Sequence, residues 1–329
     1  MKLTLLGACM GIGALLAVAG SAQAEWKLGG YTQVRLNSWD RDLDADSFDL
    51  RRVYVKAEGQ FLDQATTAKV QVDLGGLDDG VGEIKLKDAL VTHKFSSAIK
   101  GAAGFTSVPF GFEVPASNAS LLPLERSEVE RRFFPGERAT GLWFLYRPPA
   151  HGPIRPQVDL GYTNGISKWY EADASGNKDS DSHAFFGRVQ VPFAKTGLVG
   201  VSTMAATRHR TIGGVDTSFG AENVFGAHLR YDAPVGLGVQ AEVYTGEVLN
   251  VNISGWYGQV EYRLPRRSQT LFYRYDTSDR HLAHVYTRHT GGLAWDINKR
   301  ERFTLQGEFL DDYVDNGMTN YCLQYQIKY

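Results

Sequence analysis

Two adjacent arginines interrupt a segment that otherwise alternates like a β-strand. Residues 48–59 read FDLRRVYVKAEG, and their second half alternates apolar with polar side chains in the two-residue period of a strand. Extending this period backwards places Arg52 on the polar face and Arg51 on the apolar face. Guanidinium groups bind carboxylate and phosphate anions well, so the pair is a candidate anion site. We expect Arg51 to lie at the rim of the strand, or to be turned to the polar side by a β-bulge that inserts one residue.

Other basic residues fall on the polar faces of predicted strands, where acidic residues occur as well. The polar positions of the first four strands are biased towards positive charge. We expect most of these residues to be solvated wall charges, and a continuous ladder of arginines and lysines is the sharper hypothesis. Besides the adjacent pair, the candidate lining residues on strands are Arg35, Lys56, Lys85, Lys87 and Arg138.

The longest predicted connection, 107–137, carries further candidate anion ligands. It reads SVPFGFEVPASNASLLPLERSEVERRFFPGE, and its middle part has helical character. Arg126, Arg131 and Arg132 would hold an anion through charge-assisted hydrogen bonds if this segment folds into a lumen. The alternative is that the arginines pair with glutamates one helical turn away, which leaves residues 125–132 with a net charge of zero.

Sixteen segments of roughly ten residues repeat the alternation, with turn residues between them. The connections alternate between tight turns and longer stretches rich in Asp, Gly and Ser. This pattern predicts an all-β fold, a 16-stranded antiparallel transmembrane β-barrel with short turns on one rim. A barrel of this size encloses water, so its polar positions would line a channel. The predicted segments are 26–37, 47–58, 65–74, 83–94, 98–106, 138–147, 154–163, 183–192, 198–208, 222–232, 235–246, 253–264, 268–276, 286–296, 301–310 and 319–329.

A soluble β-sandwich is the main structural alternative, because it also contains many antiparallel strands. Three features favour the membrane: the even strand count, the tyrosines and tryptophans near strand ends, and the aromatic terminal strand. In 319–329, aromatic and aliphatic side chains alternate with polar ones up to Tyr329. A chain that ends in this way resembles the barrels of bacterial outer membranes.

The composition limits the cellular compartment and the partners. Residues 1–24 combine a charged start, an apolar run and a small-residue cleavage site, which predicts a signal peptide and a mature barrel domain of 25–329. Cys322 is the only cysteine in 25–329, so an intramolecular disulfide is excluded there. The formal net charge of −2 gives no general reason to bind nucleic acid.

No constellation of residues in the sequence predicts catalysis, a cofactor or a bound metal. His281, His284 and His289 have spacing that resembles a ligand set, but no paired acid accompanies them. Solvated loop histidines are the commoner meaning of such a group. Ser, His and Asp residues occur in almost any chain of this size, so their presence does not indicate a catalytic triad. A closed barrel that serves as an adhesin or structural protein is a further alternative.

Several short stretches resemble the phosphate-selective porin O/P family. Residues 48–55 with Gly59, followed by 70–74, look like the opening hairpin of that family. Residues 104–113 and 125–127 resemble its signature around an inward loop. These stretches occur in the order and spacing of the family.

The resemblance implies a homotrimeric channel in the outer membrane of a Gram-negative-type bacterium. In general porins the third long loop folds into the pore, and 107–137 is the corresponding segment here. The implied solutes are small anions, with phosphate or polyphosphate as candidates, and Arg51 and Arg52 would lie near the constriction. We therefore predict a porin for passive diffusion of small solutes, surrounded by outer-membrane lipid and without enzymatic activity. A non-selective general porin is the alternative, because the balanced charge near the inward loop would weaken anion preference.

Overall fold

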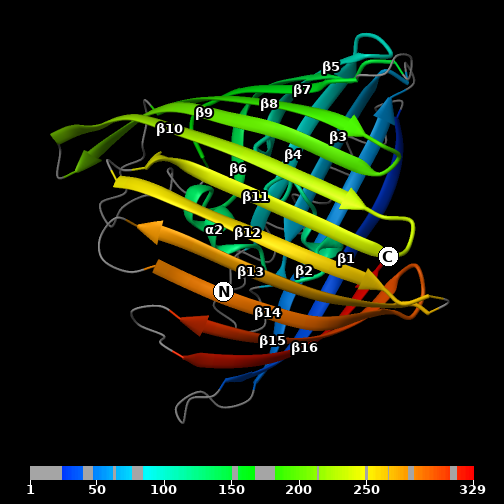
Figure 1. The fold of residues 1–329 in the computed structure, drawn as a ribbon. Coiled ribbons are helices and arrows are strands. Elements are labelled where there is room, and N and C mark those ends of the chain that lie inside the picture. The colour runs from blue at the N-terminus through cyan, green and yellow to red at the C-terminus, as the bar shows by residue number, and fades with distance from the viewer. Residues whose placement is uncertain are drawn as a thin grey trace, which may run out of the picture.

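Within the residues that the structure describes, sixteen antiparallel strands form the wall of a closed barrel in the computed structural model (Figure 1). The predicted barrel and its strand number are confirmed. The predicted signal peptide, 1–24, lies outside the described residues except for its last residue, Ala24. The structure describes residues 24–39, 47–61, 64–75, 84–149, 155–166, 182–212, 215–248, 251–265, 267–280, 285–311 and 317–329.

Each strand pairs with its neighbours in the chain, and the first strand also pairs with the last. The strands are β1 (Ala24–Trp39), β2 (Ser47–Phe61), β3 (Thr66–Asp73), β4 (Lys85–Lys94), β5 (Ile99–Ser107), β6 (Arg138–Tyr146), β7 (Gln157–Thr163), β8 (His183–Phe193), β9 (Gly197–Ile212), β10 (Val215–Asp232), β11 (Leu237–Val248), β12 (Val251–Arg263), β13 (Gln269–Arg280), β14 (Val285–Asp296), β15 (Glu301–Asp311) and β16 (Met318–Lys328). All sixteen predicted segments are strands. The predicted long connection 209–221 is wrong, because β9 and β10 extend through most of it and project beyond the neighbouring strands (Figure 1).

The seam between β1 and β16 closes the barrel at the end of the chain. Gly30 N–H donates to the Tyr329 carbonyl at 2.9 Å, and Tyr329 N–H donates to the Gly30 carbonyl at 3.1 Å. The ladder continues along both strands from Tyr31 opposite Lys328 to Trp39 opposite Asn320. Closure gives the first and last strands a partner on both sides, so the described wall is not an open sheet, as a lipid environment requires.

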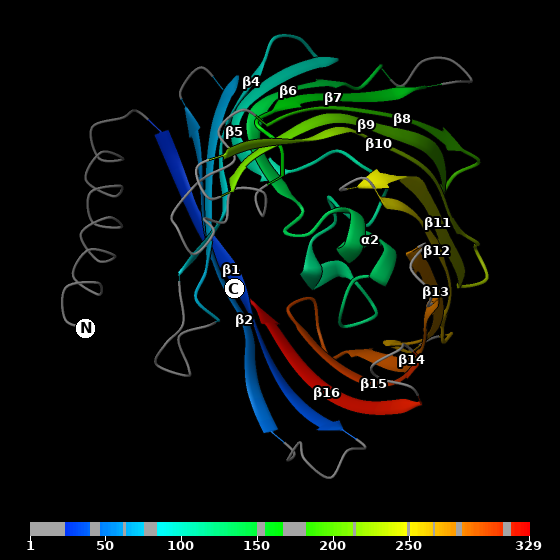
Figure 2. The same cartoon turned by 90° about the vertical axis from the view of Figure 1, so that its left-hand side faces the viewer.

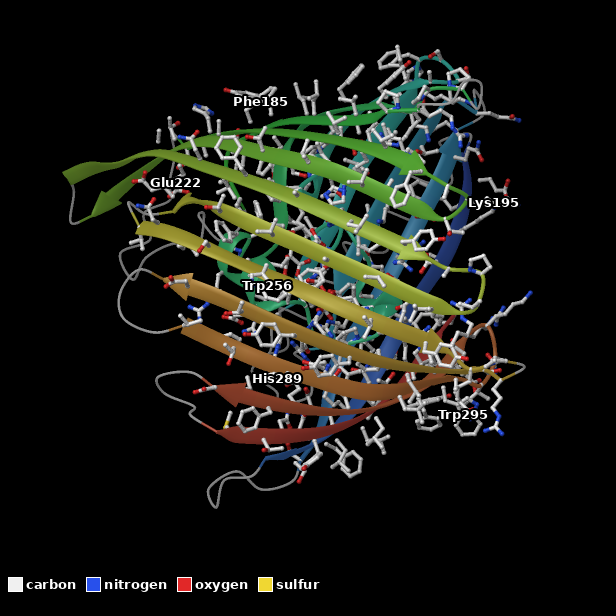
Figure 3. All side chains as sticks on the ribbon, viewed as in Figure 1. Phe185, Lys195, Glu222, Trp256, His289 and Trp295 are labelled. Atoms are coloured by element: carbon white, nitrogen blue, oxygen red, sulfur yellow. The ribbon has the colours of Figure 1, made fainter. Side chains whose placement is uncertain are left out.

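The two faces of the wall have the opposite polarity to those of a soluble barrel. Large apolar side chains such as Leu142 and Phe225 are exposed on the outer face, whereas polar ones such as Gln306 are buried on the inner face. Trp256 and Trp295 lie on the outer face of the barrel (Figure 3). An apolar exterior around a polar interior is the arrangement of a barrel embedded in lipid.

A β-bulge in β2 changes the direction of Arg51. The pairing of β1 with β2 steps from Gln33 opposite Arg52 to Arg35 opposite Asp49, so β2 contains one extra residue at this point. Of the two placements expected for Arg51, the structure has the bulge. The side chain of Arg51 therefore points inward with that of Arg52.

A second bulge lies in β4, close to the first. The pairing of β3 with β4 steps from Gln71 opposite Asp88 to Val72 opposite Leu86, which makes Lys87 the extra residue. Strict alternation from Lys87 would turn Asp88 outward, but the bulge returns Asp88 to the lumen. The two strands on either side of β3 therefore each bring an additional charged residue to the inner face.

Residues 108–137, called the inner loop below, lie inside the barrel (Figure 2). The loop contains the 3₁₀ helix η2 (Asn118–Ser120) and the α-helix α2 (Glu128–Phe133). Helix α2 begins after Ser127, whose hydroxyl accepts a hydrogen bond from Glu130 N–H at 3.4 Å. No helix in the described part of the chain is long and apolar enough to cross a membrane.

An apolar core fills one side of the barrel interior. The rings of Phe110 and Phe134 in the inner loop are tilted by 41° with their centroids 4.5 Å apart, and the Phe110 centroid lies 5.0 Å from that of Tyr244 in β11. Phe186 of β8 and Met204 of β9 belong to the same buried cluster. Apolar side chains therefore also point inward on this side, where the inner loop covers them.

Candidate functional site

The beginning of the inner loop is bound to the wall through its backbone. Glu242 of β11 accepts hydrogen bonds from the N–H groups of Phe112 at 2.8 Å and Glu113 at 2.7 Å. It also accepts from the hydroxyls of Tyr244 at 2.8 Å and Tyr257 at 2.5 Å. Four donors satisfy this buried carboxylate, so it fixes the position of the loop.

Two buried wall arginines hold the middle of the inner loop. Arg274 of β13 pairs with the carboxylate of Glu113 at 2.9 Å and donates to the Glu125 carbonyl at 2.7 Å. Arg288 of β14 donates to the Arg126 carbonyl at 2.6 Å. The loop is therefore anchored against β13 and β14, on the far side of the lumen from β2 to β4 (Figure 2).

Three of the candidate arginines converge on a single carboxylate of the inner loop. Glu125 Oε1 lies 2.8 Å from both Arg35 Nη1 and Arg51 Nε, and Glu125 Oε2 lies 2.9 Å from Arg52 Nη2. Burial alone would raise the pKa of Glu125, but the three guanidinium groups, Arg52 foremost, hold it well below its ordinary value. Glu125 is therefore ionised and neutralises part of the arginine charge.

Arg126 is a structural residue of the inner loop. It donates to the backbone carbonyls of Glu113 and Ala116, the latter at 2.7 Å, and pairs with Glu137 at 3.0 Å. Its Nε also lies 4.0 Å from Glu130, one helical turn along the chain. These partners surround a buried guanidinium and connect the two ends of the loop.

The arginines of α2 pair with a glutamate of the same helix. Glu128 lies 2.8 Å from Arg132 and 3.5 Å from Arg131. Arg132 also lies 5.6 Å from the ring centroid of Tyr286 on the wall. The pairing of charges within the helix, one of the two interpretations of this segment, is present in the structure.

Two of the cavities between the inner loop and the wall lie against the first strands of the barrel. The larger, called the lysine cavity below, has a volume of about 710 Å³ and lies against β1 to β8 with the end of β16. Its lining has six basic and two acidic side chains, a formal charge of +4. They are Lys56, Lys69, Lys100, Arg138, Arg188 and Lys328, with Asp88 and Asp159.

The smaller cavity, called the arginine cavity below, has a volume of about 360 Å³ and lies between β2 to β4 and the inner loop. Its lining has six basic and five acidic side chains, a formal charge of +1. Tyr54 and Asn118 line both cavities and are 3.5 Å apart. The cavities therefore adjoin, and together they follow the β2 to β4 side of the lumen. The charged lining residues are Arg51, Arg52, Lys85, Lys87, Arg126 and Arg131, with Asp73, Glu125, Glu128, Glu130 and Glu137.

The candidate residues from the sequence divide between the two cavities. Lys56 and Arg138 line the lysine cavity, whereas Arg51, Arg52, Lys85, Lys87, Arg126 and Arg131 line the arginine cavity. Arg35 and Arg132 line neither cavity. Arg35 contacts Glu125 of the loop from the wall, and Arg132 pairs with Glu128 within the loop.

Sequence reasoning missed several charged residues of the site. Arg188 and Lys328 lie on the polar faces of alternating segments, so strand parity was a usable signal for both. Lys100 stands among small residues without clear alternation. Glu125 carries no local signal, because its partners are distant in the chain.

Of the three histidines of the candidate metal group, the structure describes His289 alone. His281 and His284 lie outside the described residues. His289 is on the outer face of β14 (Figure 3), where Tyr273 lies 2.7 Å from its Nδ1. Among the described residues, no group of three or more His, Cys, Asp or Glu side chains is arranged to bind a metal.

No protein-family model matches the chain, and no curated protein sequence matches it. Solved structures of outer-membrane proteins share its fold. OmpT of Vibrio cholerae, in a trimer form, matches with a TM-score of 0.68 at 10% identity, over 93% of this chain and 99% of that chain. An anion-selective porin from Comamonas acidovorans matches with a TM-score of 0.66 at 12% identity, over 93% and 100% of the two chains. The outer membrane channel DcaP of Acinetobacter baumannii matches with a TM-score of 0.64 at 13% identity, over 93% of this chain and 97% of that chain.

These similarities establish the fold. The wall of this chain is the barrel found in porins and channels of Gram-negative outer membranes.

Proposed function

We propose that the protein is a channel of the outer membrane through which small solutes diffuse passively, with a preference for anions. The charge of the lysine cavity carries this proposal, because six basic side chains there face only two acidic ones. A surplus of fixed positive charge in a water-filled route raises the local concentration of anions and lowers that of cations.

The lysines of this cavity offer contacts that a passing anion can make and break. Lys56 pairs with Glu58 at 3.0 Å and Lys69 pairs with Asp88 at 2.8 Å, while each lysine exposes about a third of its side chain. Glu58 is also exposed, so the Lys56 pair is an exposed ion pair, which contributes only about 0–1 kcal/mol. An anion can therefore exchange with the carboxylate partner, be partly dehydrated by the ammonium group, and leave again.

The ten candidate residues take different parts in this proposal. Lys56, Lys85 and Lys87 are the candidate contacts for the solute, whereas Arg138 is buried and pairs with Glu137 at 3.1 Å. Arg126 binds the loop backbone, and Arg35, Arg51 and Arg52 bind Glu125. Arg131 and Arg132 pair with Glu128, and these six arginines influence the solute through their field.

Phosphate or polyphosphate is the candidate solute, on the strength of the resemblance of 48–55 and 104–113 to the phosphate-selective porin O/P family. The Comamonas structure is described as an anion-selective porin, and one Vibrio OmpT structure is a trimer form. These descriptions support an anion preference and a homotrimer embedded in outer-membrane lipid. The proposal includes no enzymatic activity, cofactor or nucleic-acid partner.

Reversal potential in a planar lipid bilayer tests the proposal. Purified protein is inserted, a potassium chloride gradient is applied, and phosphate is then added. We expect a reversal potential that favours chloride and a chloride current that phosphate reduces. The same preparation after heat unfolding controls for contaminating channels.

Each other outcome contradicts a defined part of the proposal. A channel without selectivity, or one selective for cations, would be a general porin and would contradict the anion preference. A folded protein without conductance would contradict the channel function. That result would favour the closed structural barrel, for which the extensive anchoring of the inner loop is the supporting observation.

A further inference from the structure

Glu125 occupies the centre of a three-arginine cluster. Its two carboxylate oxygens lie 2.8–2.9 Å from Arg35, Arg51 and Arg52. One carboxylate among three guanidinium groups leaves the cluster with a formal surplus of two positive charges. This short, multidentate geometry is the one by which arginines bind free carboxylates and phosphates.

The wall holds two of these arginines in place without help from Glu125. Gln324 accepts a hydrogen bond from Arg35 at 3.0 Å, and Gln33 accepts one from Arg52 at 3.0 Å. Gln33 in turn donates to Gln326 at 2.7 Å. Glutamine side chains from β1 and β16 therefore orient the guanidinium groups independently of the loop carboxylate.

The backbone around residue 125 is also held without the Glu125 side chain. Leu124 N–H donates to Gln306 at 2.9 Å, and Arg274 donates to the Glu125 carbonyl at 2.7 Å. Removal of the carboxylate would therefore leave the loop, Arg35 and Arg52 in position. The arginines form a receptor, and Glu125 is a separate group that fills it.

We infer that Arg35, Arg51 and Arg52 form a carboxylate-binding site and that Glu125 is a tethered ligand occupying it. The consequence for solutes rests on the proposed channel function. A tethered group competes at an effective concentration of about millimolar or above, so free carboxylates seldom displace it. Glu125 thus lets anions pass this point of the lumen without being captured, and it determines the specificity of the site.

Glu125→Ala tests this inference, with acetate as the probe because acetate matches the removed group. Wild type and variant are titrated in detergent micelles with ¹³C-labelled acetate, and line broadening reports binding. We expect saturable binding by the variant and binding about tenfold or more weaker by wild type. Acetate should also raise the unfolding temperature of the variant but not of wild type, because it binds the folded form alone.

Glu128→Ala is the matched control, since it also removes a loop carboxylate that pairs with two arginines. The side chain of Arg131 beside it is 56% exposed, so no enclosed site should open. We expect Glu128→Ala to bind acetate no better than wild type. We expect Glu125→Ala combined with Arg52→Ala to lose the binding that Glu125→Ala gains.

Equal acetate binding by Glu125→Ala and wild type, or by both alanine variants, would overturn the inference. If Glu125→Ala does not fold, Glu125→Gln keeps the side-chain volume and removes only the charge. Its reversal potential should then shift towards anions relative to wild type, and an unchanged potential would overturn the inference. Acetate binding is measured without current, so a wild type that does not conduct contradicts the channel proposal separately.

Discussion

The lysine cavity and the arginine cavity contain the same number of basic side chains but differ in how their charges are balanced. Five acidic side chains accompany six basic ones in the arginine cavity, and only two accompany six in the lysine cavity. Arg52 and Arg126 are buried and bound to carboxylates, whereas Lys56 and Lys69 keep about a third of their side chains exposed. The number of basic residues is therefore a poor guide to anion preference, and the unbalanced charge is a better one.

The chemistry of the two cation types explains this division. A guanidinium group is planar, weakly hydrated and rich in donors, so it suits a buried position among carboxylates and carbonyls. An ammonium group is a compact, strongly hydrated charge on a flexible stem, so it suits an open position beside solutes. In this barrel the arginines hold the inner loop in place, and the lysines are left to act on solutes.

The largest effect that we expect is a loss of stability when a buried arginine that contacts the inner loop is removed. Arg274 is fully buried, and Arg274→Ala would leave the carboxylate of Glu113 without its closest cation. We expect the free energy of unfolding to fall by about 3–5 kcal/mol. Urea unfolding of the refolded barrel in lipid vesicles measures this loss.

Arg131→Ala is the control for that prediction, because the Arg131 side chain is 56% exposed. Its loss should cost only about 0–1 kcal/mol. Similar losses in both variants would contradict the view that buried arginines hold the loop and exposed ones do not.

Reversing charge in the lysine cavity should have the next largest effect. Lys56→Glu together with Lys69→Glu changes the formal charge of the lining from +4 to zero. We expect the permeability ratio of chloride to potassium to fall to about unity, because the fixed charge that concentrates anions is gone. Reversal potential in a planar bilayer measures the ratio.

Lys195→Glu together with Lys299→Glu makes the same change of charge in turns between strands, at residues that do not line the cavity; Figure 3 labels Lys195. This variant should retain most of the anion preference. An equal loss of preference in the two variants would show that overall charge, and not the lysine cavity, sets the selectivity.

The smallest expected effect is a difference in pH dependence between two glutamates of the inner loop. Burial raises the pKa of Glu130 well above its ordinary value, although Arg126 acts in the opposite direction. The folded protein therefore retains a proton that the unfolded chain releases, and Glu130 lowers stability as the pH rises above about 4.5. Glu130→Gln should stabilise the barrel more at about pH 7 than at about pH 4.

Glu125→Gln should behave in the opposite way. Burial alone would raise the pKa of Glu125, but the arginines, Arg52 foremost, lower it well below its ordinary value. The ionised Glu125 side chain therefore stabilises the fold above about pH 4.5. This contribution is lost as the pH falls through the lowered pKa of Glu125. We expect the free energy of unfolding of Glu125→Gln to be lower than that of wild type at about pH 7 and closer to it at about pH 3. The same pH profile for both variants would contradict the difference between the two carboxylates.

The alternation of residue types was sufficient to predict the strands and the inward direction of many side chains. A strand turns successive side chains to opposite faces whatever its partner is, so Lys56 and Lys85 could be assigned to the lumen from parity. The pairing of Glu128 with Arg132 could also be predicted, because four residues span one turn of a helix. Local periodicity sufficed for these features, because each depends on residues close in the chain.

The contacts that define the site depended on the tertiary structure. Glu125 lies 73 residues from Arg52 in the chain, and neither sequence neighbourhood indicates the other. The inward direction of Arg51 follows from a bulge whose position is set by pairing with β1. The apolar side chains inside the barrel, such as Phe186, are tolerated only because the inner loop covers them. The sequence by itself thus determined which way most of the wall faces, whereas barrel closure and the folding of the loop decided which charges are neutralised and which remain for solutes.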